Sequence, residues 1–475
     1  MNSVQLSVKK QRTKYVVVDW ITTSIAFFVF NIVRFFILYG NDASFQSLLD
    51  FLGAHKLMLE QLIIPIALLG LYWLSGYYNR PFERSRLQEL MTTLGSALVN
   101  SILIYLALLT NDQIVHRSTN WELILILAGV LFIFTYIGRL TITSRTINQF
   151  KRNNWKINTL VIGCSNTAET FTKSLTGSKP ELGYNVVGYI PIAGETMSPN
   201  LTKIYSFDDI GNLAASHQID QFIISPESRN DRVVLRLLNK LFHYNLPIRI
   251  APEDIQFITS SIHLQDIFGE PLVDLTSPSI SGMSKNVKRV IDVIVSLSAL
   301  ILLSPLYAAL AIAIKYDSKG SVFYRQERIG LHQKPFNIIK FRSMRTDAEA
   351  DGPQLTSADD NRITRIGRIL RKYRLDEIPQ FWNVLIGDMS LVGPRPERKV
   401  FIDQIVEKAP YYSIIHQVRP GITSWGMVKF GYASTVDQMI ERLRYDLVYL
   451  SNMSTSVDLK ILIYTVKTVI TGRGQ

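Results

Sequence analysis

The chain has 475 residues, which is too long for one compact domain, and its formal net charge at pH 7 is +12. Hydrophobic residues make up 47% of the sequence and the mean hydropathy is +0.14, so much of the chain is expected near lipid. A basic chain can bind nucleic acid, an anionic membrane surface or a phosphorylated substrate, and the apolar stretches favour the last two. The single cysteine, Cys164, cannot form an intramolecular disulfide, so nothing requires an oxidising compartment.

Four apolar segments in the first third of the chain have about the length of a helix that crosses a bilayer. They are residues 16–38, 57–78, 90–109 and 123–140. The fourth segment is the weakest candidate because Arg139 lies near its end. Basic residues lie before the first segment, between the second and third, and after the fourth, so the positive-inside rule puts both ends of the bundle in the cytoplasm. We predict a four-helix transmembrane domain over residues 1–150.

The pattern changes at about residue 158, where a second domain is expected. Short β-rich runs at 159–163, 186–190, 221–224 and 247–250 are separated by helical or polar stretches. This alternation is typical of a doubly wound, Rossmann-like α/β domain, which we place over residues 151–278. In its first turn Ser165 occupies the position where a dinucleotide-binding fingerprint has its second glycine. Two interpretations stay open, a nucleotide-binding domain and a spacer or oligomerisation domain, and the missing glycine favours the spacer.

A fifth apolar run, residues 293–314, is interrupted in its middle by Ser304 and Pro305. Proline removes a backbone donor and clashes with the preceding turn, so the helix should kink there. Basic residues flank the run on both sides, which favours the cytoplasm for both ends. A re-entrant helix that enters one leaflet and returns agrees with both observations. The alternative is an ordinary proline-kinked span, which membranes tolerate.

Residues 362–374 have an apolar stripe and a basic face at helical spacing. Such a helix can lie in the headgroup layer of a membrane, or it can pack on a core with its basic face in water. Directly after it, Asp376 and Glu377 precede Pro379, a residue favoured in the first turn of a helix. Carboxylates there can hold a divalent metal and supply a nucleophile to phosphorus, or they can simply cap the helix.

Six stretches that are rich in basic, acidic, glycine and proline residues follow one another in the C-terminal part of the chain. They are residues 323–330, 340–344, 362–371, 375–380, 383–397 and 419–423. In this order they resemble the motifs of the bacterial sugar transferases, the monotopic polyprenyl-phosphate phosphoglycosyl transferases. The four apolar segments, the α/β region and the Ser304–Pro305 break match the long-form members of that family. The resemblance implies a mainly α catalytic domain with interfacial helices over residues 279–475. It also implies a multi-pass protein of the bacterial cytoplasmic (inner) membrane, with this domain on the cytoplasmic face.

The resemblance carries a reaction with it. It implies that Asp376 attacks the β-phosphorus of a UDP-sugar, expels UMP and forms a phosphosugar aspartyl ester, which undecaprenyl phosphate then attacks. A Mg²⁺ ion is expected at Asp376 and Glu377. For Lys340 and Arg371 a salt bridge to a carboxylate is the alternative to binding substrate. The side chains expected to bind substrate phosphates are Lys340, Arg371, Arg395, Arg325 and Arg328. Asp446 and Asp458 also match family positions, with structural ion pairs as the alternative. The expected donor is UDP-glucose or UDP-galactose, and the expected pathway is exopolysaccharide, capsule or O-antigen synthesis.

The C-terminal part of the chain departs from the family pattern at two places. Residues 424–431 differ from the run that is commonest in the family, so a sugar or nucleotide contact from that loop stays open. Ser343 stands where threonine is frequent, a mild change because both carry a hydroxyl. The histidines have no paired spacing, so no zinc site is predicted. The competing interpretations are a membrane-bound oxidoreductase or epimerase that uses NAD in the α/β domain and a non-catalytic membrane scaffold. A spacer domain would also be a natural contact in a homodimer.

Overall fold

The computed structural model describes Ser3 to Ile470 apart from residues 39–46, 80, 83, 85, 109–116, 152–155, 178–182, 217, 228–230, 245, 251–272, 275–279, 349–351 and 353–359. The chain divides into two compact units, which are described separately. One unit is residues 1–156 with 180–183, and the other is residues 157–179 with 184–475.

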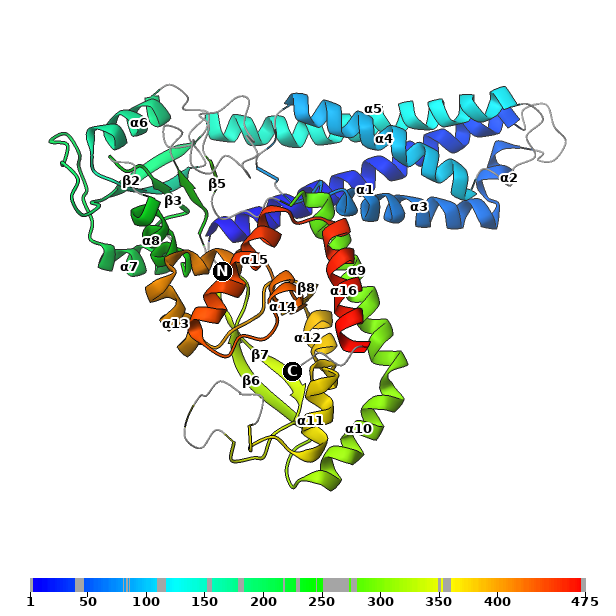
Figure 1. The fold of residues 1–475 in the computed structure, drawn as a ribbon. Coiled ribbons are helices and arrows are strands. Elements are labelled where there is room, and N and C mark those ends of the chain that lie inside the picture. Colours follow the sequence, from blue (N-terminus) through cyan, green and yellow to red (C-terminus); the bar gives the residue numbers. More distant parts are fainter. Residues whose placement is uncertain are drawn as a thin grey trace. The chain divides into compact units, whose positions relative to one another are not determined.

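The first unit is helical. Its helices are α1 (Ser3–Leu38), α2 (Leu48–Leu52), α3 (His55–Leu74), α4 (Arg86–Leu108) and α5 (Arg117–Lys151). Figure 1 shows the four long ones packed along one another, with α1 against α3 and α5, and α4 against α5. These four helices are long and apolar enough to cross a membrane, which confirms the four predicted segments. The second is shorter than predicted, because α3 ends at Leu74 and residues 75–78 form a turn.

Arg139, the residue that weakened the fourth predicted segment, is fully buried inside this bundle. Its Nε and Nη2 donate to the two carboxylate oxygens of Asp19 on α1, each over 2.8 Å. The guanidinium also lies over the rings of Tyr72 and Tyr77, and the hydroxyl of Tyr78 donates to Asp19. A charge in an apolar bundle is tolerated when it is paired in this way. The turn after α3 is therefore fastened to α1 and α5.

The second unit begins with a five-stranded sheet. Its strands are β1 (Ile157–Ile162), β2 (Tyr184–Ile190), β3 (Gln221–Ile224), β4 (Ile248–Ile250) and β5 (Val273–Asp274), in the order β2-β1-β3-β4-β5. The first four strands are parallel and β5 is antiparallel to β4. The accompanying helices are α6 (Asn166–Gly177), the 3₁₀ turn η3 (Phe207–Asp209), α7 (Ile210–Ala215) and α8 (Asp231–Phe242). The four predicted strands are present. The strand order reverses between β1 and β3, where doubly wound sheets usually bind ligands.

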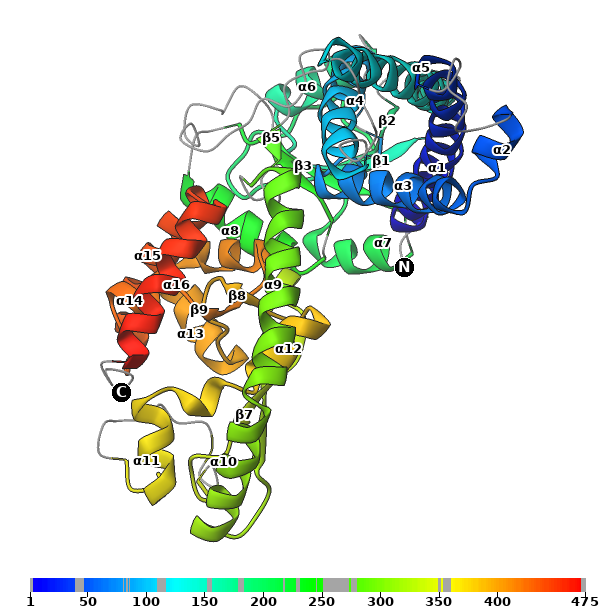
Figure 2. The ribbon, with the colours of Figure 1, turned by 90° about the vertical axis from the view of Figure 1, so that its right-hand side faces the viewer.

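The fifth apolar run forms two helices, α9 (Gly282–Leu302) and α10 (Ser304–Asp317), bent by 60° at Leu303 (Figure 2). The hydroxyl of Ser304 donates to the carbonyl of Ile301, and Pro305 stands in the first turn of α10. Proline is tolerated there because the N–H it lacks would have no partner in the helix. The predicted break is thus present at Ser304 and Pro305.

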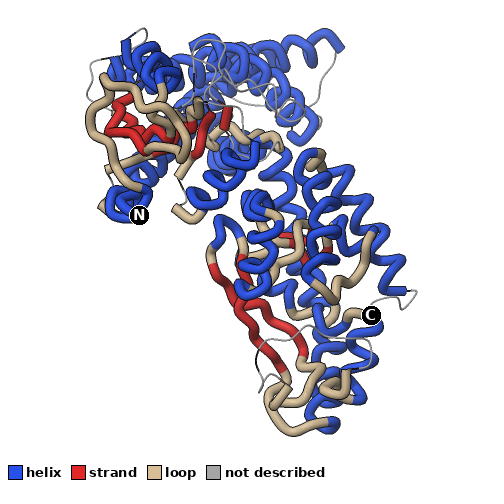
Figure 3. The backbone as a smooth tube through the Cα atoms, turned by 60° about the vertical axis from the view of Figure 1, so that its left-hand side comes forward, coloured by secondary structure: helices blue, strands red, loops and turns tan. Residues whose placement is uncertain are grey.

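The remaining elements build a mainly helical domain around a long antiparallel hairpin, β6 (Phe323–Ile329) and β7 (Pro335–Phe341), which Figure 3 shows as a two-stranded ribbon. After the hairpin turn η5 (Leu331–Gln333), the chain forms α11 (Arg365–Lys372), η6 (Leu375–Glu377), α12 (Gln380–Ile386), β8 (Ser390–Val392), α13 (Lys399–Lys408), η7 (Pro410–Gln417), β9 (Gly421–Thr423), α14 (Trp425–Lys429), α15 (Val436–Ser451) and α16 (Thr455–Ile470).

The apolar stripe predicted on residues 362–374 divides between core and surface. Leu370 packs with Ile314 of α10 and Phe341 of β7 in a buried cluster, whereas Ile369 and Tyr373 are exposed. The packing of Leu370 agrees with the core interpretation, and a place for α11 in the headgroup layer stays a prediction. The backbone N–H of Ile366 donates to Asp317 at the end of α10, so the two helices are tied together.

Candidate active site

Asp376 and Glu377 lie in η6, between α11 and α12, with Pro379 as the N-cap residue of α12. They directly precede a helix, as the position of Pro379 predicted. Arg374, the residue before η6, has φ 53° and ψ 26°. This left-handed conformation ends α11 and turns the chain toward the two carboxylates. Glycine is the usual residue at such a position, so an arginine there carries strain.

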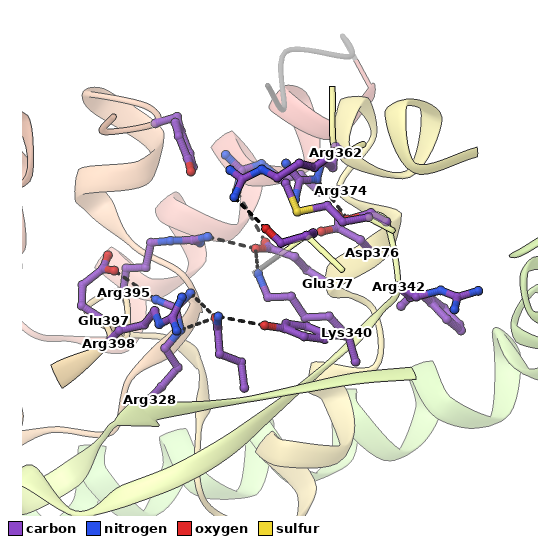
Figure 4. A pocket seen from close by; sticks show the side chains of 18 of the residues that line it. Arg328, Lys340, Arg342, Arg362, Arg374, Asp376, Glu377, Arg395, Glu397 and Arg398 are labelled. Carbon is purple, nitrogen blue, oxygen red and sulfur yellow. Dashed lines mark hydrogen bonds and ion pairs between the residues drawn. The ribbon is translucent and has the colours of Figure 1, made fainter. Parts of the chain in front are cut away.

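Glu377 is the centre of an ion-pair cluster. Its Oε1 accepts from Nζ of Lys340 at 2.9 Å and from Nη2 of Arg395 at 3.1 Å. Its Oε2 lies 3.5 Å from Nη1 of Arg374. Figure 4 shows Lys340 and Arg395 converging on this carboxylate. Burial alone would raise the pKa of Glu377, but Lys340, Arg395 and Arg374 outweigh burial and hold the pKa well below its ordinary value.

Asp376 experiences a different balance although it is the next residue. Burial raises its pKa from 3.8 to about 6, and the negative charge of Glu377 adds to that effect. The side chains of both residues line the same cavity. Two neighbouring carboxyl groups whose pKa values are driven apart are typical of a site in which one is reactive and the other fixes the geometry.

The cavity beside the two carboxylates has a volume of about 330 Å³. Its wall is strongly basic and comes from β6, β7, α11 and the segments that follow them, with Arg328, Lys340, Arg342, Arg345, Arg362, Arg371, Arg374, Arg395, Arg398 and Arg442 as the cationic side chains. Phe323, Tyr324, Phe401 and Tyr432 add aromatic surface. Clustered guanidinium groups bind phosphate by charge and by paired hydrogen bonds. The chemistry of this wall suits a phosphorylated ligand.

Two contacts fix Arg328 and Arg371 at the cavity. Glu397 accepts from Nη1 of Arg328 at 3.1 Å and, through its other oxygen, from Arg442 at 2.6 Å. Arg371 donates from Nε to the hydroxyl of Ser343 at 3.0 Å. The contact uses the hydroxyl of Ser343, a group that the threonine frequent at this position in the family also carries.

Close packing of α11 on the end of β7 supports the same wall. A Cβ atom added to Gly367 would lie 2.0 Å from the carbonyl oxygen of Ser343, so only glycine fits there. The hydroxyl of Thr364 caps the first turn of α11 by accepting from the N–H of Gly367. The arginines of α11 are held against the cavity by this contact.

The structure brings Lys340, Arg371, Arg395 and Arg328 to the cavity, but it does not bring Arg325 there. Side chains alternate along a strand, so Arg325 on β6 faces away from Tyr324 and Arg328 and is exposed. The prediction that Arg325 binds phosphate therefore finds no support in this geometry.

Asp446 and Asp458 lie outside the cavity wall. Asp446 is buried and accepts from the N–H of Gly426 at 2.9 Å, and burial raises its pKa to about 6. Asp458 accepts from Lys288 at 2.6 Å and from the hydroxyl of Tyr449 at 2.7 Å. These contacts agree with the structural alternative for both residues.

Six cationic residues of the cavity wall were not singled out from the sequence. They are Arg342, Arg345, Arg362, Arg374, Arg398 and Arg442. The left-handed turn at Arg374 has no local sequence signal when glycine is absent. Arg442 is on α15 and meets Glu397, which is 45 positions earlier in the sequence. The tertiary fold brings Arg442 to the site, whereas Arg374 lies three positions before Glu377 and reaches it through the local turn.

The predicted magnesium site can be tested against the donor atoms present. No group of three or more His, Cys, Asp or Glu side chains suited to a metal occurs in the described part of the chain. Mg²⁺, however, usually takes one or two carboxylates and completes its shell with water and substrate phosphate. Asp376 suits such a shared ion, whereas Oε1 of Glu377 is already bonded to Lys340 and Arg395.

Comparisons with known proteins agree on this region. A family model described as bacterial sugar transferase matches residues 283–472, and one described as CoA-binding domain matches residues 74–252. A UDP-N-acetylgalactosamine-undecaprenyl-phosphate N-acetylgalactosaminephosphotransferase of Aeromonas hydrophila is 44% identical over 239 residues, which are 50% of this chain and 56% of the relative. The chain thus spans little more than half of that relative.

Two further relatives are named UDP-glucose:undecaprenyl-phosphate glucose-1-phosphate transferase. The protein of Klebsiella pneumoniae is 32% identical over 367 residues, 76% of this chain and 77% of the relative. The protein of Escherichia coli is 32% identical over 299 residues, 61% of this chain and 62% of the relative. With the coverage of the Klebsiella protein and the match over residues 283–472, the chain belongs to the bacterial sugar transferase family.

Proposed function

We propose that the protein transfers a sugar 1-phosphate from a UDP-sugar to undecaprenyl phosphate and releases UMP. The names of the Aeromonas, Klebsiella and Escherichia relatives describe this class of reaction. The observation that carries the proposal is the pair Asp376 and Glu377, one with a raised pKa and one with a lowered pKa, at the wall of a basic cavity. A reaction that exchanges phosphoanhydrides needs a positioned nucleophile and neutralised phosphate charge, and this site offers both.

In the first step a carboxylate oxygen of Asp376 bonds to the β-phosphorus of the donor. The bond from that phosphorus to the bridging oxygen breaks, and UMP leaves with the electron pair. In the second step a phosphate oxygen of undecaprenyl phosphate attacks the same phosphorus, and the carboxylate of Asp376 leaves. Glu377 keeps Lys340 and Arg395 in place beside the reacting phosphate, while Arg371 adds a third cation. A bound Mg²⁺ would supply further neutralisation of the diphosphate.

The lipid acceptor requires that the cavity be near a membrane. We propose that α9 and α10 form the re-entrant element, because basic residues flank both ends and the pair bends by 60°. Ile294, Ile301, Leu302 and Ile312 on this pair are exposed, as lipid-facing side chains are. The four long helices of the first unit would anchor the chain in the bacterial inner membrane, with the transferase domain on the cytoplasmic side. A homodimer through the α/β domain stays a prediction.

Three donor sugars are candidates. The sequence suggested UDP-glucose or UDP-galactose, and the Aeromonas relative adds UDP-N-acetylgalactosamine as a donor to test. The polysaccharide pathway, whether exopolysaccharide, capsule or O-antigen, follows from the sugar and stays a prediction with it.

The test uses the full-length protein in lipid nanodiscs with undecaprenyl phosphate and Mg²⁺. UDP-glucose, UDP-galactose and UDP-N-acetylgalactosamine are supplied separately, and the released nucleotide is identified. We expect UMP from one donor, dependent on the lipid for turnover and abolished by Asp376→Asn. Asp403→Asn changes an exposed carboxylate on α13 and serves as the matched control. UDP release would contradict the reaction class, and no release from any donor would favour the scaffold.

A further inference from the structure

The turn between β1 and α6 is where an α/β domain of this topology would hold the phosphates of a nucleotide. The match to a CoA-binding domain model over residues 74–252 implies such a ligand, since CoA carries a pyrophosphate and a further phosphate. The contacts that the structure gives this turn test that implication, because a phosphate there needs free backbone N–H groups and a cavity without negative charge.

The carboxylate of Glu195 lies across the point where the strand order reverses. Its Oε2 accepts from the N–H of Cys164, just after β1, at 3.1 Å. Its Oε1 accepts from the N–H of Glu227, just after β3, at 2.8 Å. One anionic group of the chain therefore bridges the ends of the two strands between which a ligand's phosphate would be bound.

The segment that carries Glu195 is attached to the same edge of the sheet at further points. The N–H of Thr196 donates to the carboxylate of Glu227 at 2.7 Å. The N–H of Ser198 donates to the carbonyl of Cys164 at 2.8 Å, and the Ser198 hydroxyl donates to Glu169 on α6. Residues 195–200 thus form a covering segment over the crevice, bonded to β1, to α6 and to the residues after β3.

The backbone of the turn leaves little room for another group. Gly163 has φ 132°, and a Cβ added to it would lie 2.1 Å from the carbonyl oxygen of Ser225. The N–H of Gly163 donates to Ile190, and the N–H of Ala168 donates to the hydroxyl of Ser165 at 3.3 Å. Ser165, which replaces the second fingerprint glycine, therefore acts as a cap for α6 inside the protein.

The charge at the turn also opposes a phosphate. Glu169, Glu195 and Glu227 gather there, and Lys173 pairs with Glu169 at 2.5 Å. Burial, together with the charge of Glu195, raises the pKa of the Cys164 thiol to about 11. A pyrophosphate entering this crevice would have to displace the carboxylate of Glu195 and approach the one of Glu227.

We infer that this crevice is closed by the chain's own Glu195 carboxylate and that the α/β domain does not bind CoA or a dinucleotide there. Residues 195–200 connect the ends of β1 and β3 with α6 at the place where a ligand would bind. The domain then has a structural role. At this edge of the sheet it is similar to CoA-binding domains in its fold and not in its ligand.

The first test measures binding of CoA and NAD⁺ to the full-length protein in nanodiscs by equilibrium titration, with amide hydrogen exchange recorded in parallel. We expect no saturable binding that changes exchange at Cys164, Glu227 or residues 195–200. Saturable binding with faster exchange of residues 195–200 would overturn the inference, because a phosphate would then have replaced Glu195. Binding that leaves these amides unchanged would place the ligand elsewhere and would support closure of the crevice.

The second test weakens the closure itself. In Glu195→Gln one acceptor oxygen becomes an amide that cannot accept, so one of the two N–H groups loses its partner. We expect roughly tenfold faster exchange at Cys164 or Glu227, about the effect of one hydrogen bond. Asp208→Asn, at an exposed carboxylate in the same domain, is the control and should leave both amides unchanged. Equal exchange in Glu195→Gln and the wild type would also overturn the inference.

Discussion

Nζ of Lys340 donates to Oε1 of Glu377 over 2.9 Å, so a lysine of the hairpin is committed to the second carboxylate of the pair. Glu377 is buried and Lys340 is partly buried at the cavity, where an unpaired charge would be costly. Burial lowers the pKa of Lys340, with Arg395 acting in the same direction, and Glu377 opposes that shift. The contact therefore keeps a cation next to Asp376, the carboxylate that we propose as the nucleophile.

Asp376→Asn should abolish transfer and yet stabilise the protein. The pKa of Asp376 is higher in the folded protein than in the unfolded chain. Such a group stabilises the fold at a pH below its unfolded pKa, and this stabilisation is lost as the pH rises through the folded pKa of about 6. At neutral pH the ionised Asp376 thus destabilises the fold by on the order of 3 kcal/mol. Denaturant unfolding of the wild type and the variant at pH 7.5 and pH 4 checks this. The gain should shrink at the lower pH, and a less stable variant at neutral pH would contradict the argument.

Glu377→Gln should have the opposite effect on stability. Removing this charge leaves Lys340, Arg395 and Arg374 facing one another without their shared counter-ion. Breaking a buried ion pair from one side typically costs about 3 to 5 kcal/mol. We expect a lower unfolding midpoint together with a large loss of transfer activity. Equal stability of Glu377→Gln and Asp376→Asn would show that the two carboxylates are not distinguished as the contacts indicate.

The pH profile should report Asp376. A protonated carboxyl group is a poor nucleophile, so kcat/KM should fall as pH drops below about 6, the pKa to which burial raises this group. The profile is measured from pH 5 to pH 8 with saturating lipid acceptor. An enzyme whose kcat/KM stays flat down to pH 5 would contradict the raised pKa of the free protein.

Two substitutions of Arg374 separate the effect of its charge from the effect of its backbone conformation. Arg374→Gly and Arg374→Ala both remove the guanidinium that lies 3.5 Å from Glu377, so both should lose activity to a similar degree. Only glycine adopts φ 53° without strain, so the glycine variant should be more stable than the alanine variant by about 1 kcal/mol. Thermal unfolding and initial rates of UMP release give the two quantities. The activities of the glycine and alanine variants can be compared as free energies. If they differ by as much as the stabilities of these variants do, the backbone turn and not the charge determines activity.

The Asp19–Arg139 pair should hold the four-helix bundle together. Arg139→Met leaves Asp19 buried without its bidentate partner and should cost about 3 to 5 kcal/mol. The double variant Asp19→Asn with Arg139→Met should recover most of this loss, because neither charge is then left alone. Arg145→Met, at an exposed arginine on the same helix, is the control. Thermal unfolding in detergent is measured for the wild type, Asp19→Asn, Arg139→Met, the double variant and the control. A double variant whose loss of stability equals the sum of the two single losses would contradict the pairing.

The sequence predicted well those features that depend on local pattern. Apolar runs of sufficient length located α1, α3, α4 and α5, and Pro305 located the bend between α9 and α10. The end of α3 was missed because Tyr77 and Tyr78 read as apolar continuation, whereas their hydroxyls bond Glu89 and Asp19. That choice depends on partners far away in the sequence.

The site was predicted through motifs and not through contacts. The motifs located Asp376, Lys340 and Arg395, but they do not say which carboxylate receives the cations. Arg325 and Arg328 are three positions apart on β6, so strand alternation separates them, and this could have been read from the sequence had β6 been recognised as a strand.

The most direct measurement mixes the purified protein with the UDP-sugar that it uses, before any lipid phosphate is added. We expect a burst of up to one equivalent of UMP per protein. We also expect a peptide containing Asp376 whose mass is increased by one sugar phosphate, and both signals should be absent in Asp376→Asn. Later addition of undecaprenyl phosphate should discharge the modified peptide. UMP that appears only once the lipid is present, with Asp376 never modified, would contradict covalent transfer through this carboxylate.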